Sequence, residues 1–239
     1  MITIIKTRKI AVKDTGARLM VPAEIDNKIK DNWNELLKIH PFLFNGPVFS
    51  TVNMIDLDGE VTLECELSDY ANYQYVQKYD IGEYSCKNTY AGCLLKSADD
   101  RIFVSLNGSG SENEGKIQFI GGVIDSEDRN EIGDLDPIIA AKRELFEETG
   151  AVIRDSIVSY GSTYLITDGS KYGIQTIFGS KLNSEEILAA FDEFKNSSDN
   201  TEIARIISFG KDNANELTRY EKRHDLGVID LMNEVIAGL

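Results

Sequence analysis

The chain of 239 residues contains little proline, cysteine and histidine, and each scarcity excludes a class of protein. With 4 prolines, 19 glycines and no repeat period, it is not collagen-like, proline-rich or a solenoid. The three cysteines, Cys65, Cys86 and Cys93, are odd in number and lack C-x-x-C spacing, so we expect neither a disulfide framework nor a structural zinc site. Its 2 histidines are too few for a histidine-rich metal centre.

Positive charge and long apolar runs are scarce as well. The chain has 25 Lys and Arg against 40 Asp and Glu, which gives a net charge of -15. Such an acidic surface repels phosphate backbones, so we expect no duplex nucleic acid as a partner, although a metal ion could bridge the chain to a small phosphorylated substrate. No apolar run is long enough to span a bilayer, and the first residues do not resemble a signal peptide. We therefore expect a cytoplasmic protein that does not bind membranes.

Strand-like and helix-like patterns are interleaved along the chain, which indicates an α/β or α+β protein. We expect an N-terminal accessory α+β region over residues 1–86 and a main α/β domain over residues 87–239. The patterns predict helices over residues 23–39, 69–75, 137–149, 185–195 and 228–237, and strands within 2–12 and over 48–55, 61–67, 90–95, 102–106, 116–120, 157–165, 173–182 and 203–209.

Residues 137–149, with the sequence PIIAAKRELFEET, carry the clearest helix signals in the chain. Asp136 can cap the helix, and Pro137 occupies the first helical position, where a missing N–H costs nothing. Gly150 can adopt the left-handed conformation just past the end. The apolar residues Ile138, Ala141 and Leu145 share one face, which we expect to pack against a sheet.

Three carboxylates project from an adjacent face of this helix, because Glu144, Glu147 and Glu148 stand at i, i+3 and i+4. Like charges this close destabilise a helix, and Arg143, four residues before Glu147, can compensate only one of them. Clusters of this kind usually form a solvated face. Alternatively, a hard divalent cation such as Mg²⁺ or Mn²⁺ would satisfy the carboxylate oxygens.

The segment from Arg143 to Gly150, RELFEETG, resembles the helical half of the Nudix box, whose pattern is R-E-(apolar)-x-E-E-x-G. Gly121 and Gly122, which follow an apolar strand, resemble the opening glycines of that box. The resemblance implies a Nudix hydrolase with an α/β/α sandwich built on a mixed sheet. Such an enzyme cleaves a nucleoside diphosphate that is linked to a further group.

The resemblance also implies a role for each matching residue. Glu147 and Glu148 match metal ligands, and the carbonyl of Gly121 matches a further ligand. Glu144 matches a position that binds metal or acts as the base, and Arg143 matches the residue that orients these carboxylates. The implied cofactor is Mg²⁺ or Mn²⁺.

The chain departs from the pattern G-x5-E-x7-R-E between the two halves of the box. Eight residues before Arg143, where the pattern has Glu, stands Leu135, and the loop Val123–Asp136 carries an insertion of 7 residues. We expect this loop at the rim of the site, with Glu127 and Asp128 as outer carboxylates that tune metal affinity. The carboxylate that replaces the Glu of the pattern could be Glu127, Asp128, Asp134 or Asp136, and the sequence does not choose among them.

Two further features concern the substrate and the base. Glu202, between a polar loop and the strand IARIIS, is either a further catalytic carboxylate or a solvent-exposed loop residue. The segments FNGPVF (residues 44–49) and LSDY (residues 67–70) are loosely similar to segments in the N-terminal region of Nudix proteins that act on nucleotide sugars. Phe44 and Tyr70 would then line a nucleotide pocket, or they are ordinary core residues.

Three hypotheses for the function follow. The first is metal-dependent hydrolysis of a nucleotide sugar, and the second applies the same chemistry to ADP-ribose or a dinucleotide. The third is a catalytically silent Nudix scaffold that binds a nucleotide or a protein. The expected partner is a small nucleotide, and the sequence is compatible with a homodimer but does not set the oligomeric state.

Overall fold

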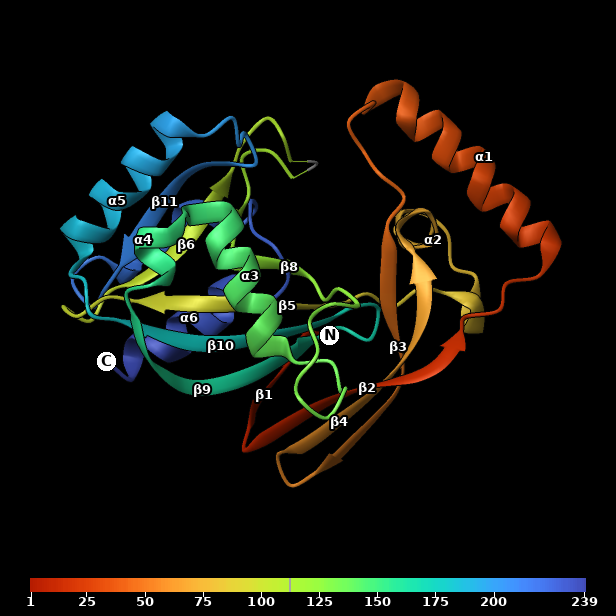
Figure 1. Ribbon diagram of the computed structural model, residues 1–239, viewed down its shortest axis with the longest axis horizontal. Helices are drawn as coiled ribbons and strands as arrows, with labels where there is room; N and C mark the ends of the chain where they lie inside the picture. The colour runs from red at the N-terminus through yellow and green to blue at the C-terminus, as the bar shows by residue number, and fades with distance from the viewer. Residues whose placement is uncertain (112) are drawn as a thin grey trace.

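The computed structural model describes residues 1–111 and 113–239 and contains a large and a small sheet (Figure 1). The large sheet has the order β1-β9-β10-β5-β6-β11, with β8 beside β5 and β7 beside β6. It is a mixed sheet, because β10 and β5 run parallel while the other pairs are antiparallel. Its strands are β1 (Thr3–Thr7), β5 (Thr89–Lys96), β6 (Ile102–Asn107), β7 (Ile117–Gln118), β8 (Ile120–Val123), β9 (Ile157–Thr167), β10 (Tyr172–Ser180) and β11 (Ile203–Phe209).

Helices cover both faces of the large sheet, so this part of the chain is a mixed α/β structure (Figure 1). Along β5, Cys93 and Leu95 join the core under α3 (Pro137–Thr149), α4 (Ala151–Arg154) and α5 (Ser184–Ser197). Leu94 joins the core on the other face, under α6 (Val228–Ala237) and the 3-10 helix η2 (Ala214–Tyr220). This alternation is the period of two that a strand covered on both sides requires.

The small sheet consists of β2 (Lys9–Arg18), β4 (Glu60–Asp69) and β3 (Pro47–Leu57), in that order. Two helices, α1 (Ala23–Ile39) and α2 (Tyr70–Val76), pack on each other beside it through Trp33, Ala71 and Tyr75. The chain then passes through the 3-10 helix η1 (Gly82–Tyr84) into β5. No helix in the described part of the chain is long and apolar enough to cross a membrane.

The two sheets are joined by chain connection and by a shared core. The edge strand β1 pairs with β9 in the large sheet, and β2 of the small sheet follows directly after Arg8. One buried cluster contains Val12 and Leu63 of the small sheet together with Ala91 and Leu165 of the large one. The first strand of the N-terminal region, β1, therefore belongs to the large sheet, whose other strands all follow residue 86.

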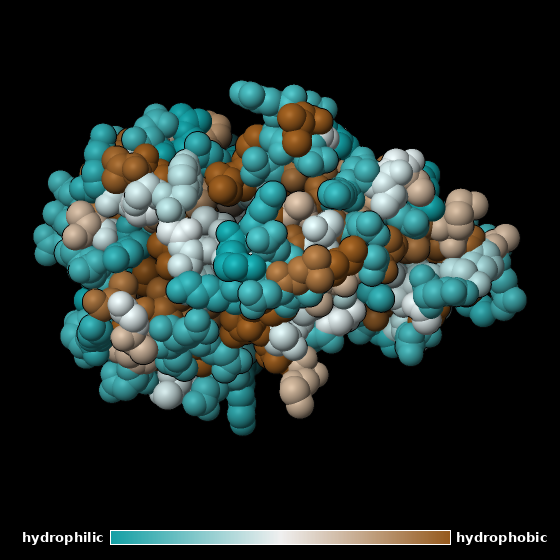
Figure 2. All heavy atoms as spheres, turned by 90° about the horizontal axis from the view of Figure 1, so that it is seen from below, coloured by the Kyte–Doolittle hydropathy of each residue, from teal (hydrophilic) through white to brown (hydrophobic). Residues whose placement is uncertain are grey.

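The face of the molecule shown in Figure 2 is largely hydrophilic. In the face shown in Figure 2, hydrophobic residues form separate patches between hydrophilic ones. All three cysteines are buried and free.

Most predicted elements are present, and residues 137–149, 203–209 and 228–237 form the expected elements with the predicted bounds. The prediction of one continuous strand over residues 116–120 is wrong. This segment changes partner at Phe119, because β7 pairs with β6 while β8 pairs with β5. The short helix α4 and the 3-10 helix η2 are additional to the prediction.

Local signals define α3 as expected. The Asp136 side chain accepts hydrogen bonds from the N–H groups of Ile138 at 2.8 Å and Ile139 at 3.4 Å. Gly150 ends the helix with a φ of 86°. This is a positive φ as predicted, but its ψ of 174° lies outside the left-handed helical region.

We expect Asp136→Ala to lower the free energy of unfolding by about 1 kcal/mol, because the first turn of α3 loses its cap. Urea unfolding followed by circular dichroism measures this change. The control is Glu131→Ala, which removes an exposed carboxylate from the same loop and should leave the midpoint within error. Equal stability of Asp136→Ala and the wild type would contradict the capping role.

Candidate active site

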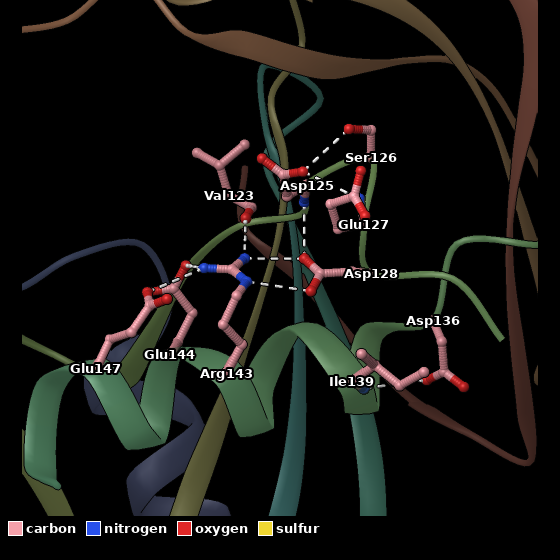
Figure 3. Close-up of polar contacts among 10 residues, drawn as sticks. All are labelled: Val123, Asp125, Ser126, Glu127, Asp128, Asp136, Ile139, Arg143, Glu144 and Glu147. Atoms are coloured by element: carbon pink, nitrogen blue, oxygen red, sulfur yellow. Dashed lines mark hydrogen bonds and ion pairs between the residues drawn. The ribbon is translucent and has the colours of Figure 1, made fainter.

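Arg143 of α3 is the centre of a hydrogen-bonded cluster beside the loop that follows β8 (Figure 3). Its Nη1 donates to Glu144 Oε1 at 2.7 Å and to Glu147 Oε2 at 3.2 Å. Its Nη2 donates to the Val123 carbonyl at 3.0 Å and to Asp128 Oδ2 at 2.8 Å, and Nε donates to Asp128 Oδ1 at 3.1 Å. The prediction that Arg143 compensates a single glutamate is therefore wrong. The planar fork of guanidinium donors reaches two glutamates and an aspartate at once.

Asp128 is the carboxylate of the loop that belongs to this cluster. Its side chain is 2% exposed, and besides Arg143 it accepts a hydrogen bond from the Asp125 N–H at 2.8 Å. Glu127, by contrast, is exposed. The expectation that Asp128 lies at the rim is wrong, because its side chain is buried against Arg143, and its effect on metal affinity stays a prediction.

Counting residues forward from Gly122 selects Asp128 from among the four candidate carboxylates of the loop. Five residues separate Gly122 from Asp128, which is the spacing of G-x5-E in the pattern, and this count would place the insertion between Asp128 and Arg143. The count backward from Arg143 ends on Leu135 and would place the insertion before Asp128. Leu135 itself is 2% exposed and belongs to the core that joins the two sheets.

Glu148 lies beneath this cluster, against β8. It is 3% exposed, and its Oε2 accepts a hydrogen bond from the Gly121 N–H at 3.1 Å. Burial raises the pKa of this carboxyl well above its ordinary value, and the nearby Glu144 and Glu202 raise it further. The structure thus brings Gly121 and Glu148 together through the N–H of Gly121, whereas the resemblance implies a role for its carbonyl, which stays a prediction.

Glu144 and Glu202 complete the group of carboxylates. Burial raises the pKa of Glu144 to about 7, although Arg143 acts in the opposite direction. Glu202, just before β11, is exposed overall but lines the same cavity as Arg143 and Glu144. Desolvation of its carboxylate and the charge of Glu147 raise its pKa. The structure therefore places all the predicted site residues, Glu202 included, around the C-terminal half of α3.

The two glycines allow the carboxylates to approach the sheet. A Cβ atom at Gly122 would collide with the carboxylate of Glu144, and one at Gly121 would collide with the backbone of Ala91 and Gly92. Gly121 also has a φ of 157°. Side chains at these two positions would displace Glu144 or separate β8 from β5.

The donor set fits a divalent cation in its chemistry. Carboxylate oxygens are the ligands that Mg²⁺ and Mn²⁺ prefer, and a cation would favour the charged forms of Glu144 and Glu148, whose pKa values are raised by burial and by the neighbouring carboxylates. Within residues 1–111 and 113–239, however, no three Asp, Glu, His or Cys side chains already converge as a metal-binding group. A cation would have to compete with Arg143 for Glu144 and Glu147.

A cavity of about 590 Å³ extends from these carboxylates to the N-terminal region. Its far wall contains Phe42, Phe44 and Tyr70. Phe44 is 80% exposed, so the interpretation of this residue as part of the core is wrong.

A second cavity of about 520 Å³ shares Gly122 and Val123, among other residues, with the first. It is lined largely by amides, phenols and lysines, among them Tyr73, Gln74, Gln77, Asn88, Lys116 and Lys171.

A scan against models of known protein families finds no match to the chain, and a search of curated proteins finds no similar sequence.

We expect Asp128→Ala to lower the free energy of unfolding by about 2 kcal/mol, because Arg143 loses two charge-assisted hydrogen bonds and the Asp125 N–H loses its acceptor. Glu127→Ala is the matched control, since it removes the neighbouring exposed carboxylate and should change stability by less than about 0.5 kcal/mol. Urea titrations of both variants measure the two changes. Equal losses in the two variants would show that Asp128 has no special structural role.

Proposed function

We propose that this chain is a metal-dependent hydrolase of the Nudix type that cleaves the diphosphate linkage of a nucleotide sugar. The observation that carries the proposal is the arrangement around Arg143, which holds Asp128, Glu144 and Glu147 beside Gly122. A solvated helix face does not explain this arrangement, because Asp128 is buried and its partner Arg143 is largely so. The order of glycines, loop carboxylate, Arg and glutamates along the chain also supports the Nudix assignment.

Glu147, Glu148, Glu144 and the Gly121 carbonyl would hold Mg²⁺ or Mn²⁺. When bound, such an ion neutralises diphosphate charge and activates water for attack on phosphorus. Arg143 orients the carboxylates through its hydrogen bonds. The Oε1 atom of Glu144 accepts from Arg143, which leaves Oε2 to take a proton from water, and Glu202 is the alternative base in the same cavity.

The two joined cavities support a substrate with two dissimilar ends. The exposed rings of Phe42 and Phe44 offer flat surfaces on which a nucleobase can stack. The amides of Gln77 and Asn88 in the second cavity suit the hydroxyl groups of a sugar. The cavities share Tyr70, Asn113, Gln118, Gly122 and Val123. Gly122 lies next to the carboxylate of Glu144, and the diphosphate would lie there.

One observation favours a second candidate, a nucleotide-binding scaffold without activity. Arg143 already contacts Glu144 and Glu147, and no ready-made metal-binding group is present among the residues that the structure describes. A hydrolysis assay with nucleotide sugars, ADP-ribose and dinucleotides, in Mg²⁺ and in Mn²⁺, separates the candidates. We expect release of a nucleoside monophosphate from nucleotide sugars. Preference for ADP-ribose would contradict the substrate class, and nucleotide binding without turnover would support the scaffold.

The double variant Glu147→Gln/Glu148→Gln should lose measurable binding of Mg²⁺ and Mn²⁺ in isothermal titration calorimetry. It should still fold, because the substitutions relieve repulsion between like charges. Glu193→Gln, an exposed position on α5, removes an acid far along the chain from the box and should bind as the wild type does. Unchanged metal binding by the double variant would contradict the ligand assignment.

Arg143→Ala should lower kcat roughly 10- to 100-fold while metal binding persists, because Arg143 orients ligands without being one. The control is Arg154→Ala, which removes an arginine just after α3 whose ion-pair partner is Asp155. Steady-state kinetics and calorimetry on both variants provide the test. Turnover of Arg143→Ala at the wild-type level would refute its positioning role.

A further inference from the structure

The small N-terminal sheet is tied to the loop of the candidate active site by one ion pair. Asp14 of β2 accepts a hydrogen bond from Arg129 Nη2 through its Oδ2 atom at 2.6 Å, although 115 residues separate the two along the chain. Both side chains are partly buried, with 20% of Asp14 and 33% of Arg129 exposed. The contact therefore lies in the junction between the two parts of the molecule.

The other donors of Arg129 connect the residues of the loop before Asp128 with those after it. Its Nε donates to the Ser126 carbonyl at 3.0 Å, and its Nη1 donates to the Gly133 carbonyl at 2.7 Å. Across the same loop, the Asp136 N–H donates to the Asp128 carbonyl at 2.7 Å. One guanidinium thus connects β2, the residues before Asp128 and the inserted residues after it.

Leu135 provides a second anchor for this loop. It forms isolated β-bridges with Val12 of β2 and with Arg129, and its side chain is buried in the core shared by the two sheets. Both anchors use residues that follow Asp128. The segment after Asp128 therefore has a structural role, because its residues Arg129 and Leu135 attach the loop to β2 of the N-terminal sheet.

Asp128 stands directly before Arg129 and is the residue that receives two hydrogen bonds from Arg143. A loop fixed at Arg129 fixes the position of Asp128, and Asp128 in turn sets the direction of the Arg143 guanidinium. Arg143 then determines where the carboxylates of Glu144 and Glu147 lie.

We propose that Asp14 is a positioning residue for the candidate active site, and that the N-terminal sheet sets the orientation of Arg143 through Arg129 and Asp128. The effect on turnover rests on the proposed hydrolase function, whereas the effect on the loop does not. The pair is partly open to solvent, which lowers its contribution to global stability, so we expect the consequence of breaking it to fall mainly on the geometry of the site.

The test compares Asp14→Asn with Asp14→Glu, which keeps the carboxylate, and with Asp58→Asn as a matched control. Asp58 belongs to the turn of the same small sheet, and its ion-pair partner is Arg8 rather than a residue of the loop. We expect Asp14→Asn to lower kcat about tenfold, with KM within twofold of the wild type and the urea midpoint unchanged. Asp14→Glu should recover most of kcat, and Asp58→Asn should behave as the wild type.

Hydrogen exchange provides a readout that does not depend on activity. Amides of residues 123–136 should exchange at least threefold faster in Asp14→Asn than in Asp58→Asn, while the core strands β5 and β10 exchange as in the wild type. Unchanged exchange in this loop, or a uniform increase over the whole chain, would overturn the proposal. If the wild type hydrolyses nothing in the panel, the proposed function fails, and exchange in the loop alone decides whether Asp14 positions it.

Discussion

Several carboxylates meet at one end of α3, and the structure depends on how their mutual repulsion is balanced. Arg143 contacts Asp128, Glu144 and Glu147, while Glu148 is buried behind them with the Gly121 N–H as a donor. In a chain with a net charge of -15, no general excess of positive charge is present to offset such a group. One guanidinium with several donors is able to bind carboxylates from two segments at once. Burial, and after it the neighbouring carboxylates, raise the pKa values of Glu144 and Glu148, and this cost of charging them is the physical basis for proposing a cation at this place.

The fold brings these groups together by simple means. The N-cap by Asp136 and the positive φ of Gly150 fix both ends of α3, which packs on β5 and β8. Gly121 and Gly122 let β8 and the side chain of Glu144 approach each other without Cβ atoms between them. The N-terminal region adds a wall of exposed aromatic residues and, through Asp14, a contact to the loop. It therefore contributes to the site in two ways, although its sheet is separate from the sheet that carries α3.

Local signals in the sequence were sufficient to predict α3 and the set of residues on it. Caps, a first-position proline and a terminal glycine act within a few residues, so they can be read without knowledge of the fold. The role of Asp128 depends on an ion pair across 15 residues, so the sequence could not choose it from among Glu127, Asp134 and Asp136. The contact between Asp14 and Arg129 has no local signal at all. The change of partner at Phe119 was missed for a similar reason, since pairing between strands is set by the whole sheet.

The central claim is that the carboxylates of α3 hold a divalent cation beside the two glycines. The most direct test is a crystal structure of the protein soaked in Mn²⁺, with diffraction data collected at the manganese absorption edge. We expect an anomalous peak for a manganese ion that is bound by carboxylate oxygens of Glu147 and Glu148 and by the carbonyl of Gly121, with Arg143 still paired to Asp128. An empty site at saturating Mn²⁺, or manganese found only on exposed acids elsewhere, would contradict it.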